Sequence, residues 1–300
     1  MEVLSAKEMA KVDALTIAHD LSGEILMERA GQGAALEILS FLEHFHPRHR
    51  RRLVIVCGKG NNAGDGYVIA RALCDKIELV VWSLFPISDL KGDAFLNAQR
   101  LPKVVQNFGE VELQEGDIII DCLLGTGLQS DVREPFVTAI KYINQSELPT
   151  VSIDMASGLN GTTGLAQGTT VIADLTLCIG RPKLGNFYQD GPEYSGRLRC
   201  IDIGFPQKYF DQIESKERAV FEQDIHDHFH RRKSSVHKYQ CGNVVVLGGS
   251  PSYLGAPSLA AAMAQRAGCG MVTMILPTQV GQVIERRHDS LIVDKVISQD

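Results

Sequence analysis

Short runs of apolar, β-forming residues alternate with segments of helical periodicity, and this alternation restricts the fold more than any other feature of the chain. The expected strands span 53–57, 78–82, 117–121, 150–154, 171–178 and 198–203. The expected helices span 5–19, 23–43, 65–75, 90–101 and 133–144. Strands that are apolar along their whole length suit a parallel sheet covered on both faces. We therefore predict a three-layer α/β fold with a mostly parallel, Rossmann-like sheet.

The turn between the first strand and its helix reads Gly58-Lys59-Gly60-Asn61-Asn62-Ala63-Gly64-Asp65-Gly66. Glycines allow backbone N–H groups to approach a ligand, and the positive end of a helix favours phosphate. The two asparagines and the aspartate add side-chain oxygens that can bind a hydroxyl group or a cation. The turn therefore predicts a nucleotide site.

Three motif interpretations compete for this turn. It lacks the Lys-Ser or Lys-Thr of a Walker A loop. Residues 58–63 match a relaxed dinucleotide fingerprint, but the acidic residue that should close the second strand is missing, because Glu78 opens that strand. A glycine turn that serves only tight strand–helix packing remains an alternative.

Composition limits the classes of partner and compartment. A length of 300 residues suffices for one large or two ordinary domains, and 44% hydrophobic residues provide a core. The net charge of −6 gives no support for nucleic-acid binding. Seven cysteines without a C-x-x-C pair suit free thiols in a reducing compartment. We found neither a signal peptide nor a membrane-length apolar run, so we expect a cytoplasmic protein that binds no membrane and no nucleic acid.

Acidic residues close two further strands. Asp121 precedes Gly125-Thr126-Gly127-Leu128, and Asp154 precedes Ser157-Gly158-Leu159. The carboxyl ends of parallel strands share one edge of the sheet, where ligands bind at the switch in strand order. A single aspartate at a strand end is usually a helix cap. Polar residues after three such strands, with Asn61 to Asp65 included, predict a ligand site.

Residues 212–236 are rich in charge and are predicted to be a linker. The histidines His226, His228 and His230 alternate within it, but no further cluster of ligands accompanies them, so a solvated linker is favoured over a metal site. A second core follows, with strands at 243–247 and 271–276 and an alanine-rich helix at 258–267.

Several motifs together resemble a known family. They are Leu26-Met27-Glu28-Arg29-Ala30-Gly31, residues 60–66, Asp121-Cys122-Leu123-Leu124-Gly125-Thr126-Gly127, Asp154-Met155-Ala156-Ser157-Gly158-Leu159 and Lys183-x-Gly185. In this order they resemble the NAD(P)H-hydrate epimerases over about residues 1–210, which implies an epimerase domain at 1–211. Members interconvert the R and S hydrates of NADH and NADPH and bind potassium.

The resemblance implies roles for individual residues. Substrate binding falls to Asn61, Asn62, Ala63, Gly64, Asp65, Gly125, Thr126, Gly127, Leu128, Gln129, Ser130, Asp131, Asp154 and Lys183. Potassium falls to Asn62, Asp121 and Ser157, whose oxygens suit a hard cation. Asp154 is the expected acid/base residue, because epimerisation needs a proton given and taken at the hydroxyl group. Lys183 either balances the diphosphate charge or is a surface lysine.

Two positions depart from the family pattern. Ala63 replaces a glycine, and its methyl group would be unfavourable if the backbone φ there were positive. Met155-Ala156 replaces Ile-Pro before Ser157, which removes a proline that would stiffen the loop. Both changes are expected to weaken binding without changing the chemistry.

Residues 237–300 resemble the start of the ADP- or ATP-dependent NAD(P)H-hydrate dehydratase, a ribokinase-like domain. The motifs are His237-Lys238, residues 242–250 and Tyr253-Leu254-Gly255-Ala256. The resemblance makes Ala256 a vestigial substrate contact and implies that dehydration is absent from this fragment. Its uncovered apolar faces would either pack on the first domain or a dimer mate, or leave the segment partly disordered.

Two competing functions stand beside the epimerase. A non-catalytic nucleotide-binding or scaffold module of the same fold is the first, although such a module would be expected to lose Asp65, Asp121 and Asp154. A conventional dehydrogenase is the second, and the misplaced Glu78 argues against it. The expected partner is a small molecule, hydrated NADH or NADPH, and we allow for a homodimer.

Overall fold

The computed structural model describes residues 1–44, 52–102, 105–128, 130–213, 217–221, 224–226, 235–284 and 292–296. The chain forms two compact units, Met1–Phe221 and Glu222–Asp300. Each unit is described by itself. His226 is exposed, whereas His228 and His230 lie outside the described residues.

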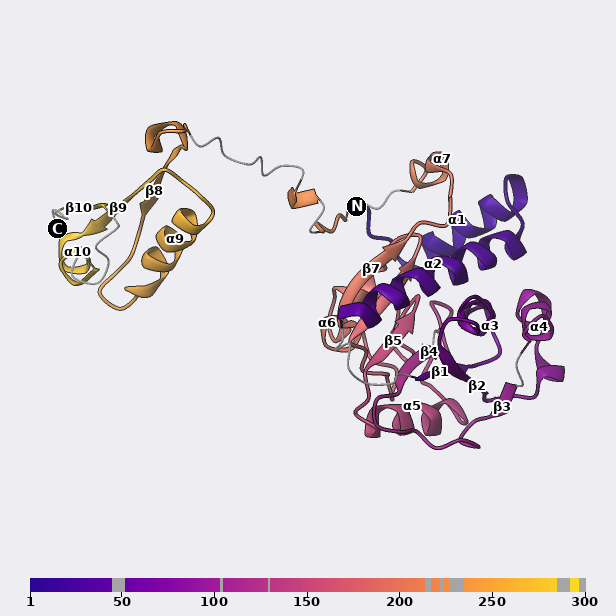
Figure 1. Ribbon diagram of the computed structural model, residues 1–300. Coiled ribbons are helices and arrows are strands. Elements are labelled where there is room, and N and C mark those ends of the chain that lie inside the picture. The colour runs from indigo at the N-terminus through magenta and orange to yellow at the C-terminus, as the bar shows by residue number, and fades with distance from the viewer. Residues whose placement is uncertain are drawn as a thin grey trace. The chain divides into compact units, whose positions relative to one another are not determined.

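The first unit alternates helices and strands along most of its length (Figure 1). Its helices are α1 (Ala6–His19), α2 (Gly23–His44), α3 (Asn61–Leu73), α4 (Gly92–Gln99), α5 (Phe136–Gln145), α6 (Gly191–Ser195) and α7 (Gln207–Phe210), with short 3₁₀ turns η1 (Ile87–Asp89) and η2 (Leu184–Asn186). Its strands are β1 (Arg52–Cys57), β2 (Glu78–Ser83), β3 (Val105–Asn107), β4 (Ile118–Cys122), β5 (Thr150–Ile153), β6 (Leu175–Ile179) and β7 (Arg197–Ile201).

The seven strands form one parallel sheet in the order β3-β2-β1-β4-β5-β6-β7. The predicted α/β class with a mostly parallel sheet is confirmed. From β1 the chain builds outward through β2 and β3, and it then returns to place β4 on the other side of β1. The order therefore reverses between β1 and β4, and the loops after these two strands flank the switch point where such sheets bind ligands.

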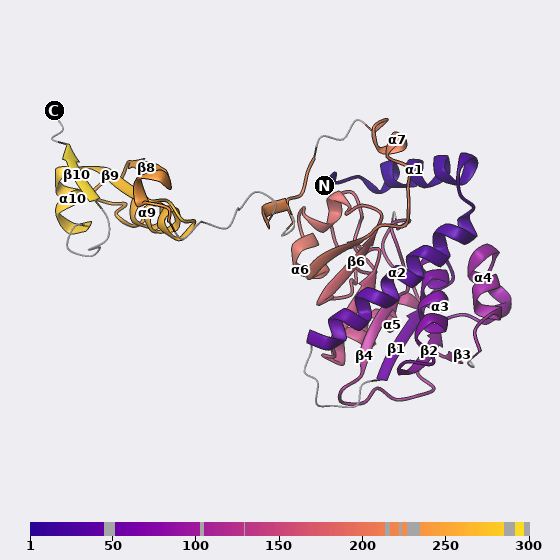
Figure 2. The same cartoon turned by 45° about the horizontal axis from the view of Figure 1, so that its top comes forward.

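Helices cover both faces of the sheet (Figure 2). Leu53, Ile55 and Cys57 of β1 pack into the same apolar cluster as residues of α2 and α3. Val54 and Val56 point to the opposite face, into a cluster that includes α5. Because successive side chains of a strand alternate between faces, a fully apolar strand fills both cores.

Small residues let α2 and α3 approach closely. A Cβ atom added at Gly31 of α2 would lie 2.4 Å from Val68 Cβ and 3.1 Å from the Asp65 carbonyl oxygen of α3. A Cβ atom at Gly64 of α3 would lie 2.5 Å from Met27 Sδ. The contact fixes the first turn of α3 against α2.

The N-terminal segment is tied to two distant parts of the first unit. Ser5 and Glu8 form the predicted capping box at the start of α1. Just before it, the Leu4 N–H donates to the Pro182 carbonyl oxygen (3.1 Å) and the Leu184 N–H donates to the Leu4 carbonyl oxygen (2.8 Å). On its other side, the Val3 N–H donates to the Glu217 carbonyl oxygen (2.9 Å).

Several elements differ from the prediction, and three of them have a clear physical explanation. The helix expected at 65 begins at Asn61, because the chain enters helical geometry directly after Gly60. The strand expected over 171–178 begins at Leu175, since the preceding residues form the turn where the Asp174 side chain accepts from the Thr150 N–H. The short edge strand β3 was missed because its three residues carry little apolar signal.

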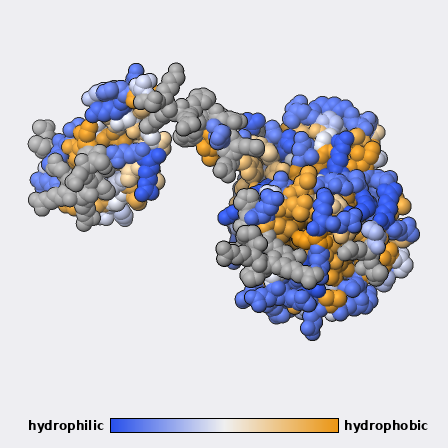
Figure 3. Space-filling model, in the orientation of Figure 1, coloured by the Kyte–Doolittle hydropathy of each residue, from blue (hydrophilic) through white to orange (hydrophobic). Residues whose placement is uncertain are grey.

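The second unit contains a smaller parallel sheet in the order β10-β9-β8. Its main elements are β8 (Asn243–Leu247), α9 (Gly255–Arg266), β9 (Met271–Pro277), α10 (Thr278–Ile284) and β10 (Ile292–Val296), after a 3₁₀ turn η3 (Lys238–Gln240). Val272, Met274 and Leu276 of β9 are buried, but Val245 and Leu247 of β8 are 55% and 77% exposed. Apolar residues thus reach the surface of this unit (Figure 3).

No helix among the described residues is long and apolar enough to cross a membrane.

The close approach of α2 and α3 generates a stability prediction. Gly31→Ala is expected to lower the free energy of unfolding of the first unit by about 1–3 kcal/mol, because the new methyl group must displace Val68 or separate the helices. Trp82 is the only tryptophan and is buried in β2, so its fluorescence reports unfolding of this unit. Gly127→Ala is the matched control, as no atom lies within 4 Å of its added Cβ. Equal effects of both changes would contradict the prediction.

Candidate functional site

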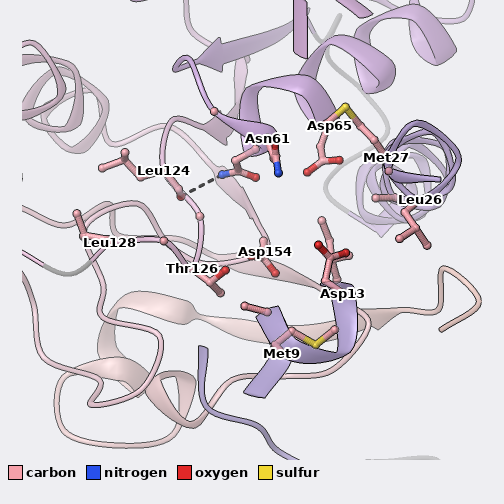
Figure 4. Close-up of a pocket in the computed structure, with 18 of the residues that line it drawn as sticks. Met9, Asp13, Leu26, Met27, Asn61, Asp65, Leu124, Thr126, Leu128 and Asp154 are labelled. Atoms are coloured by element: carbon pink, nitrogen blue, oxygen red, sulfur yellow. Dashed lines mark hydrogen bonds between the residues drawn. The ribbon is translucent and has the colours of Figure 1, made fainter. Parts of the chain in front are cut away.

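A cavity of about 770 Å³ opens at the carboxyl edge of the sheet, around the switch point between β1 and β4. The loop after β1, the loop after β4 and the end of β5 supply its polar wall. Helices α1 and α2 supply much of its apolar wall through Met9, Ile17, Leu26 and Met27. Figure 4 shows polar side chains from several of these elements pointing into the same space.

The glycine-rich turn contributes through the first turns of α3. Asn61, Asn62 and Asp65 line the cavity, and Lys59 lies just before them. Ala63 and Gly64 belong to the buried side of α3 and do not line the cavity. The asparagines and the aspartate thus lie on the helix rather than in a loop.

The glycines of this turn serve two purposes. A Cβ atom at Gly58 would lie 2.2 Å from the Leu123 carbonyl oxygen, so this glycine permits the close approach of the loops after β1 and β4. A Cβ atom at Gly60 would meet nothing within 4 Å. Packing alone therefore does not explain the glycine at position 60, which precedes the N-terminus of α3.

Asp121 is a fully buried carboxylate at the end of β4. Its oxygens accept hydrogen bonds from Leu123 N (3.1 Å), Ser152 Oγ (2.8 Å), Ser157 N (2.9 Å) and Ser157 Oγ (2.6 Å). Burial raises the pKa of Asp121 despite these hydrogen bonds, which act in the opposite direction. The side chain joins the loop after β4 to β5 and to the loop that follows β5.

Oxygen atoms gather around Leu124, directly next to this carboxylate. Asn62 Nδ2 donates to the Leu124 carbonyl oxygen (3.0 Å), and the Leu124 N–H donates to Ser157 Oγ (2.8 Å). Asn62 Oδ1 is buried and has no hydrogen-bond partner among the described residues. An unpartnered amide oxygen beside a buried carboxylate and a hydroxyl oxygen fits the ligand set of a hard cation.

The described residues contain no group of three or more His, Cys, Asp or Glu side chains that could hold a metal ion. The residues expected to hold potassium are an asparagine, an aspartate and a serine, so they would not form such a group. Their arrangement is therefore compatible with a weakly held alkali cation and unlike a zinc site.

Asp154 follows β5 with an unusual backbone. Its φ of 67° lies in the left-handed region, which aspartate tolerates better than most residues but which still costs free energy. The Asp154 N–H donates to the Leu177 carbonyl oxygen (2.8 Å), which fixes this conformation. A Cβ atom at Gly125 would lie 3.4 Å from Asp154 Oδ2, so the glycine leaves room for the carboxylate at the cavity.

Lys183 forms an ion pair with Asp154. Its Nζ contacts Asp154 Oδ1 and also donates to the Ile179 carbonyl oxygen at 3.0 Å. Only 1% of Lys183 is exposed, so the second of the two alternatives for this residue, a surface lysine, is wrong.

Asp13 and Asp65 face the same cavity as Asp154. Burial, together with the charges of Asp154 and Asp13, raises the pKa of Asp65 well above its usual range, and Lys183 acts in the opposite direction. Three carboxyl groups and one buried lysine therefore share this part of the site. Such a cluster favours the retention of at least one carboxyl proton.

The remaining predicted residues fall into three groups. Gly125, Thr126, Gly127, Leu128 and Ser130 line the cavity as expected. Asp131 is exposed and lies outside its lining, and Gln129 lies outside the described residues. Ala256, the expected dehydratase contact, is an exposed residue of α9 in the second unit.

The two departures from the family pattern can be located. Ala63 lies in α3 and is not among the residues with positive φ, so the expected backbone strain at this position is wrong. Met155 and Ala156 are fully buried beside Ser157. Ser157 is held by Asp121 through two hydrogen bonds without a proline before it.

The cavity residues that the sequence interpretation missed come mainly from α1 and α2. Asp13 is the clearest case, because Met9, Asp13 and Ile17 lie four residues apart and share a helix face. That spacing was the one sequence signal that placed Asp13 on the same helix face as Met9 and Ile17. It was indistinguishable from the core-facing stripe of an ordinary amphipathic helix.

Comparison with known families agrees with this geometry. Residues 23–185, just over half of the chain, match the family described as YjeF-related protein N-terminus. Residues 244–300 match the family described as NAD(P)H-hydrate dehydratase. The resemblance inferred from the motifs is confirmed, and the small sheet of the second unit belongs to the dehydratase match.

Curated relatives match nearly the whole length of this chain. The chain is 34% identical over 299 residues to the bifunctional NAD(P)H-hydrate repair enzyme Nnr of Moorella thermoacetica, covering 95% of this chain and 56% of that protein. It is 34% identical to the protein of the same name from Salinibacter ruber, covering 93% and 55%. The chain thus spans about half the length of these relatives.

A solved structure supports the fold. The crystal structure of yeast ynu0, YNL200c, superposes with a TM-score of 0.57 at 19% identity, covering 75% of this chain and 98% of that one.

Asp65 gives a pH-dependent prediction. Its raised pKa means that, above the unfolded value of about 3.8, the unfolded chain loses this proton first, so the stability of the wild type falls as pH rises towards the folded pKa. Asp65→Asn removes this loss. At pH 7 the variant is expected to unfold at a higher urea concentration than wild type, with a free energy of unfolding larger by about 1 kcal/mol. Near pH 4 its free energy of unfolding is expected to match that of wild type.

Trp82 fluorescence measures this unfolding, and the exposed Asp131→Asn is the charge-matched control. A destabilised Asp65→Asn protein at pH 7 would refute the assignment.

Proposed function

Because the chain belongs to the family described as YjeF-related protein N-terminus, we propose that its first unit interconverts the R and S forms of hydrated NADH and NADPH. The observation that carries this proposal is the Asp154–Lys183 ion pair, which presents a carboxylate to a dinucleotide-sized cavity at the switch point of the sheet. The two curated relatives named above are called NAD(P)H-hydrate repair enzymes, which supports this class of substrate.

The substrate is proposed to lie across the cavity with its hydrated nicotinamide ring beside Asp154. The diphosphate binds near the N-terminus of α3, where Gly60 leaves space and the helix dipole favours an anion. Lys59 supplies the cation at this end of the cavity and packs over the Phe85 ring at 5.0 Å. This assignment gives the phosphate-binding role to Lys59 instead of Lys183.

The reaction inverts the ring carbon that carries the hydroxyl group. A carboxyl group protonates the hydroxyl oxygen, the carbon–oxygen bond breaks with its electron pair leaving on water, and the ring nitrogen stabilises the resulting cation. Water then adds to the opposite face and returns a proton to a carboxylate. Asp154 is proposed to take part in this proton transfer, with Lys183 setting its orientation.

Potassium is proposed to bind Asn62 Oδ1, Asp121 and Ser157 Oγ. The ion would compensate the buried charge of Asp121 and give the orphaned amide oxygen a partner. When bound, it would supply a fixed positive charge that helps to order the loop Gly125–Leu128 against the substrate.

Two competing functions are weaker. A scaffold would have no need to keep Asp65 and Asp154 in a cavity at a cost in stability. A dehydrogenase needs an acid at the carboxyl end of β2, but Glu78 lies at the opposite end of that strand and Ser83 closes it.

The 300 residues by themselves are proposed to lack dehydratase activity. The dehydratase match covers residues 244–300, whose small sheet leaves Val245 and Leu247 of β8 exposed. The activity of the longer relatives is therefore not assigned to the second unit alone.

The proposed function is tested with the R hydrate of NADPH and a separate S-specific dehydratase as reporter. Wild type is expected to accelerate conversion, and Asp154→Asn to lose at least about 100-fold in kcat, because the proton-transfer group is gone. The exposed Asp75→Asn is the control and should retain wild-type rates. Without the reporter, no ADP- or ATP-dependent loss of the S hydrate is expected. A folded wild type that converts nothing would refute the epimerase.

Potassium has a test independent of catalysis. Potassium chloride is expected to raise the unfolding free energy of wild type over the same concentration of tetramethylammonium chloride, by about 1.4 kcal/mol when the ion exceeds its Kd tenfold. Asn62→Leu should abolish this difference because it removes the orphaned oxygen. The exposed neighbour Asn61→Leu should preserve it. A potassium effect that survives in Asn62→Leu would exclude the site.

A further inference from the structure

We propose that Asp13 of α1 is a second acid/base residue of the epimerase site and acts opposite Asp154. The inference rests on the proposed function and deepens it. Asp13 lies outside the matched region 23–185, and no residue of α1 was assigned a role above.

The position of Asp13 on α1 is the first observation. Met9, Ala10, Asp13 and Ile17 line the cavity from one face of the helix. Three of these four side chains are apolar, and Asp13 is the single charged one. A carboxyl group within an apolar stripe loses hydration without gaining packing, which is unfavourable unless the group has a use. The solvated side of α1 carries its other charges, such as Lys7 and Lys11.

The second observation is that Asp13 has no competing partner. Within the described part of the chain, no hydrogen bond or ion pair involves its side chain. Asp154 differs, because Lys183 already occupies one of its oxygens. Asp13 is therefore free to contact a ligand in the cavity, as its direction in Figure 4 also indicates.

Asp65 provides an independent indication that a ligand belongs here. It is only 7% exposed, lines the cavity, and likewise has no hydrogen-bond or ion-pair partner among the described residues. An unpartnered buried carboxyl group aimed at a cavity requires a ligand or a proton to satisfy it. The negative charges of Asp154 and Asp13 raise the pKa of Asp65, and the positive charge of Lys183 lowers it.

The backbone holds Asp13 and Asp154 in a fixed relation. Leu4, just before α1, is hydrogen-bonded to Pro182 and Leu184 on both sides of the lysine that pairs with Asp154. At the other end of α1, Asp20 accepts hydrogen bonds from Lys208 Nζ (2.9 Å) and from Tyr209 Oη. A helix anchored at both ends can hold a proton-transfer group to the precision that catalysis needs.

The charges facing Asp13 favour its acid form. Burial and then the negative charge of Asp154 raise the pKa of Asp13. The other titratable groups at the cavity are Asp65 on α3, Lys183 before η2, and Lys59 and Asp93 further along the wall. A bound diphosphate adds further negative charge, which disfavours a second ionised carboxyl group.

These roles give a balanced reaction. In one direction, the Asp13 carboxyl group donates its proton to the hydroxyl oxygen, the carbon–oxygen bond breaks, and water leaves with the electron pair. The ring cation that remains is attacked by a water molecule on the face towards Asp154, which accepts that water's proton. In the reverse direction the two aspartates exchange roles, so both faces of the ring have a proton-transfer group.

The test compares Asp13→Asn with wild type in the full 300-residue chain, using the R-hydrate assay. We expect kcat to fall roughly 100-fold or more while KM changes less than about threefold, because a neutral amide preserves shape and removes only the proton. Asp13→Glu is expected to recover part of kcat and to shift the pH profile of kcat. In water labelled with ¹⁸O, Asp13→Asn should lose oxygen exchange in parallel with epimerisation.

Lys11→Gln is the control on the same helix, because Lys11 is exposed on the solvated side of α1 and does not line the cavity. It should stay within about threefold of wild type. An equal loss in Lys11→Gln, or an unchanged kcat and pH profile in folded Asp13→Asn, would overturn the role of Asp13. Trp82 fluorescence establishes folding, and the pH profile of Asp13→Glu decides the matter if Asp13→Asn does not fold. An inactive wild type would instead refute the proposed function.

Discussion

The buried carboxylate of Asp121 is the constraint on which the rest of the site depends. Its hydrogen bonds join the loop after β4 to Ser152 and Ser157 of the next strand and loop. Removing a carboxylate from water is unfavourable unless donors or a cation compensate it, so the surrounding loops cannot move apart without exposing an unsatisfied charge. Asn62 contacts the same loop at Leu124, and Asp154 lies next to it at Gly125. The positions of both side chains therefore depend on the position of this loop.

The electrostatics of the cavity oppose stability. Asp13 and Asp65 have raised pKa values, and Asp154 adopts a left-handed backbone conformation in an ion pair with Lys183. Hydrophobic residues of similar size would remove these penalties, whereas the apolar clusters on both faces of the sheet contain no comparable charge. Contributions that lower the stability of a well-packed domain and lie at one end of it are typical of a functional site.

The sequence predicted the parts of this structure that repeat a local pattern. Apolar strands such as 53–57 identified a parallel sheet, and the acids at their ends identified the edge where Asn62, Asp121 and Asp154 converge. It did not predict the burial of Lys183, because the contact with Asp154 spans 29 positions and leaves no local trace. The start of α3 was misplaced for a related reason, since glycine and asparagine have weak helix propensity and only tertiary contacts with α2 favour helix there.

The N-terminal segment shows why a site can extend beyond the region that defines a family. The matched region begins at residue 23, yet α1 forms a wall of the cavity. Backbone hydrogen bonds place Leu4 between Pro182 and Leu184, and the adjacent Val3 pairs with Glu217 near the end of the first unit. A displacement of this segment would therefore move Asp13 and the Lys183 loop together. The relative position of Asp13 and Asp154 thus depends on pairing between both ends of the first unit, as well as on the central sheet.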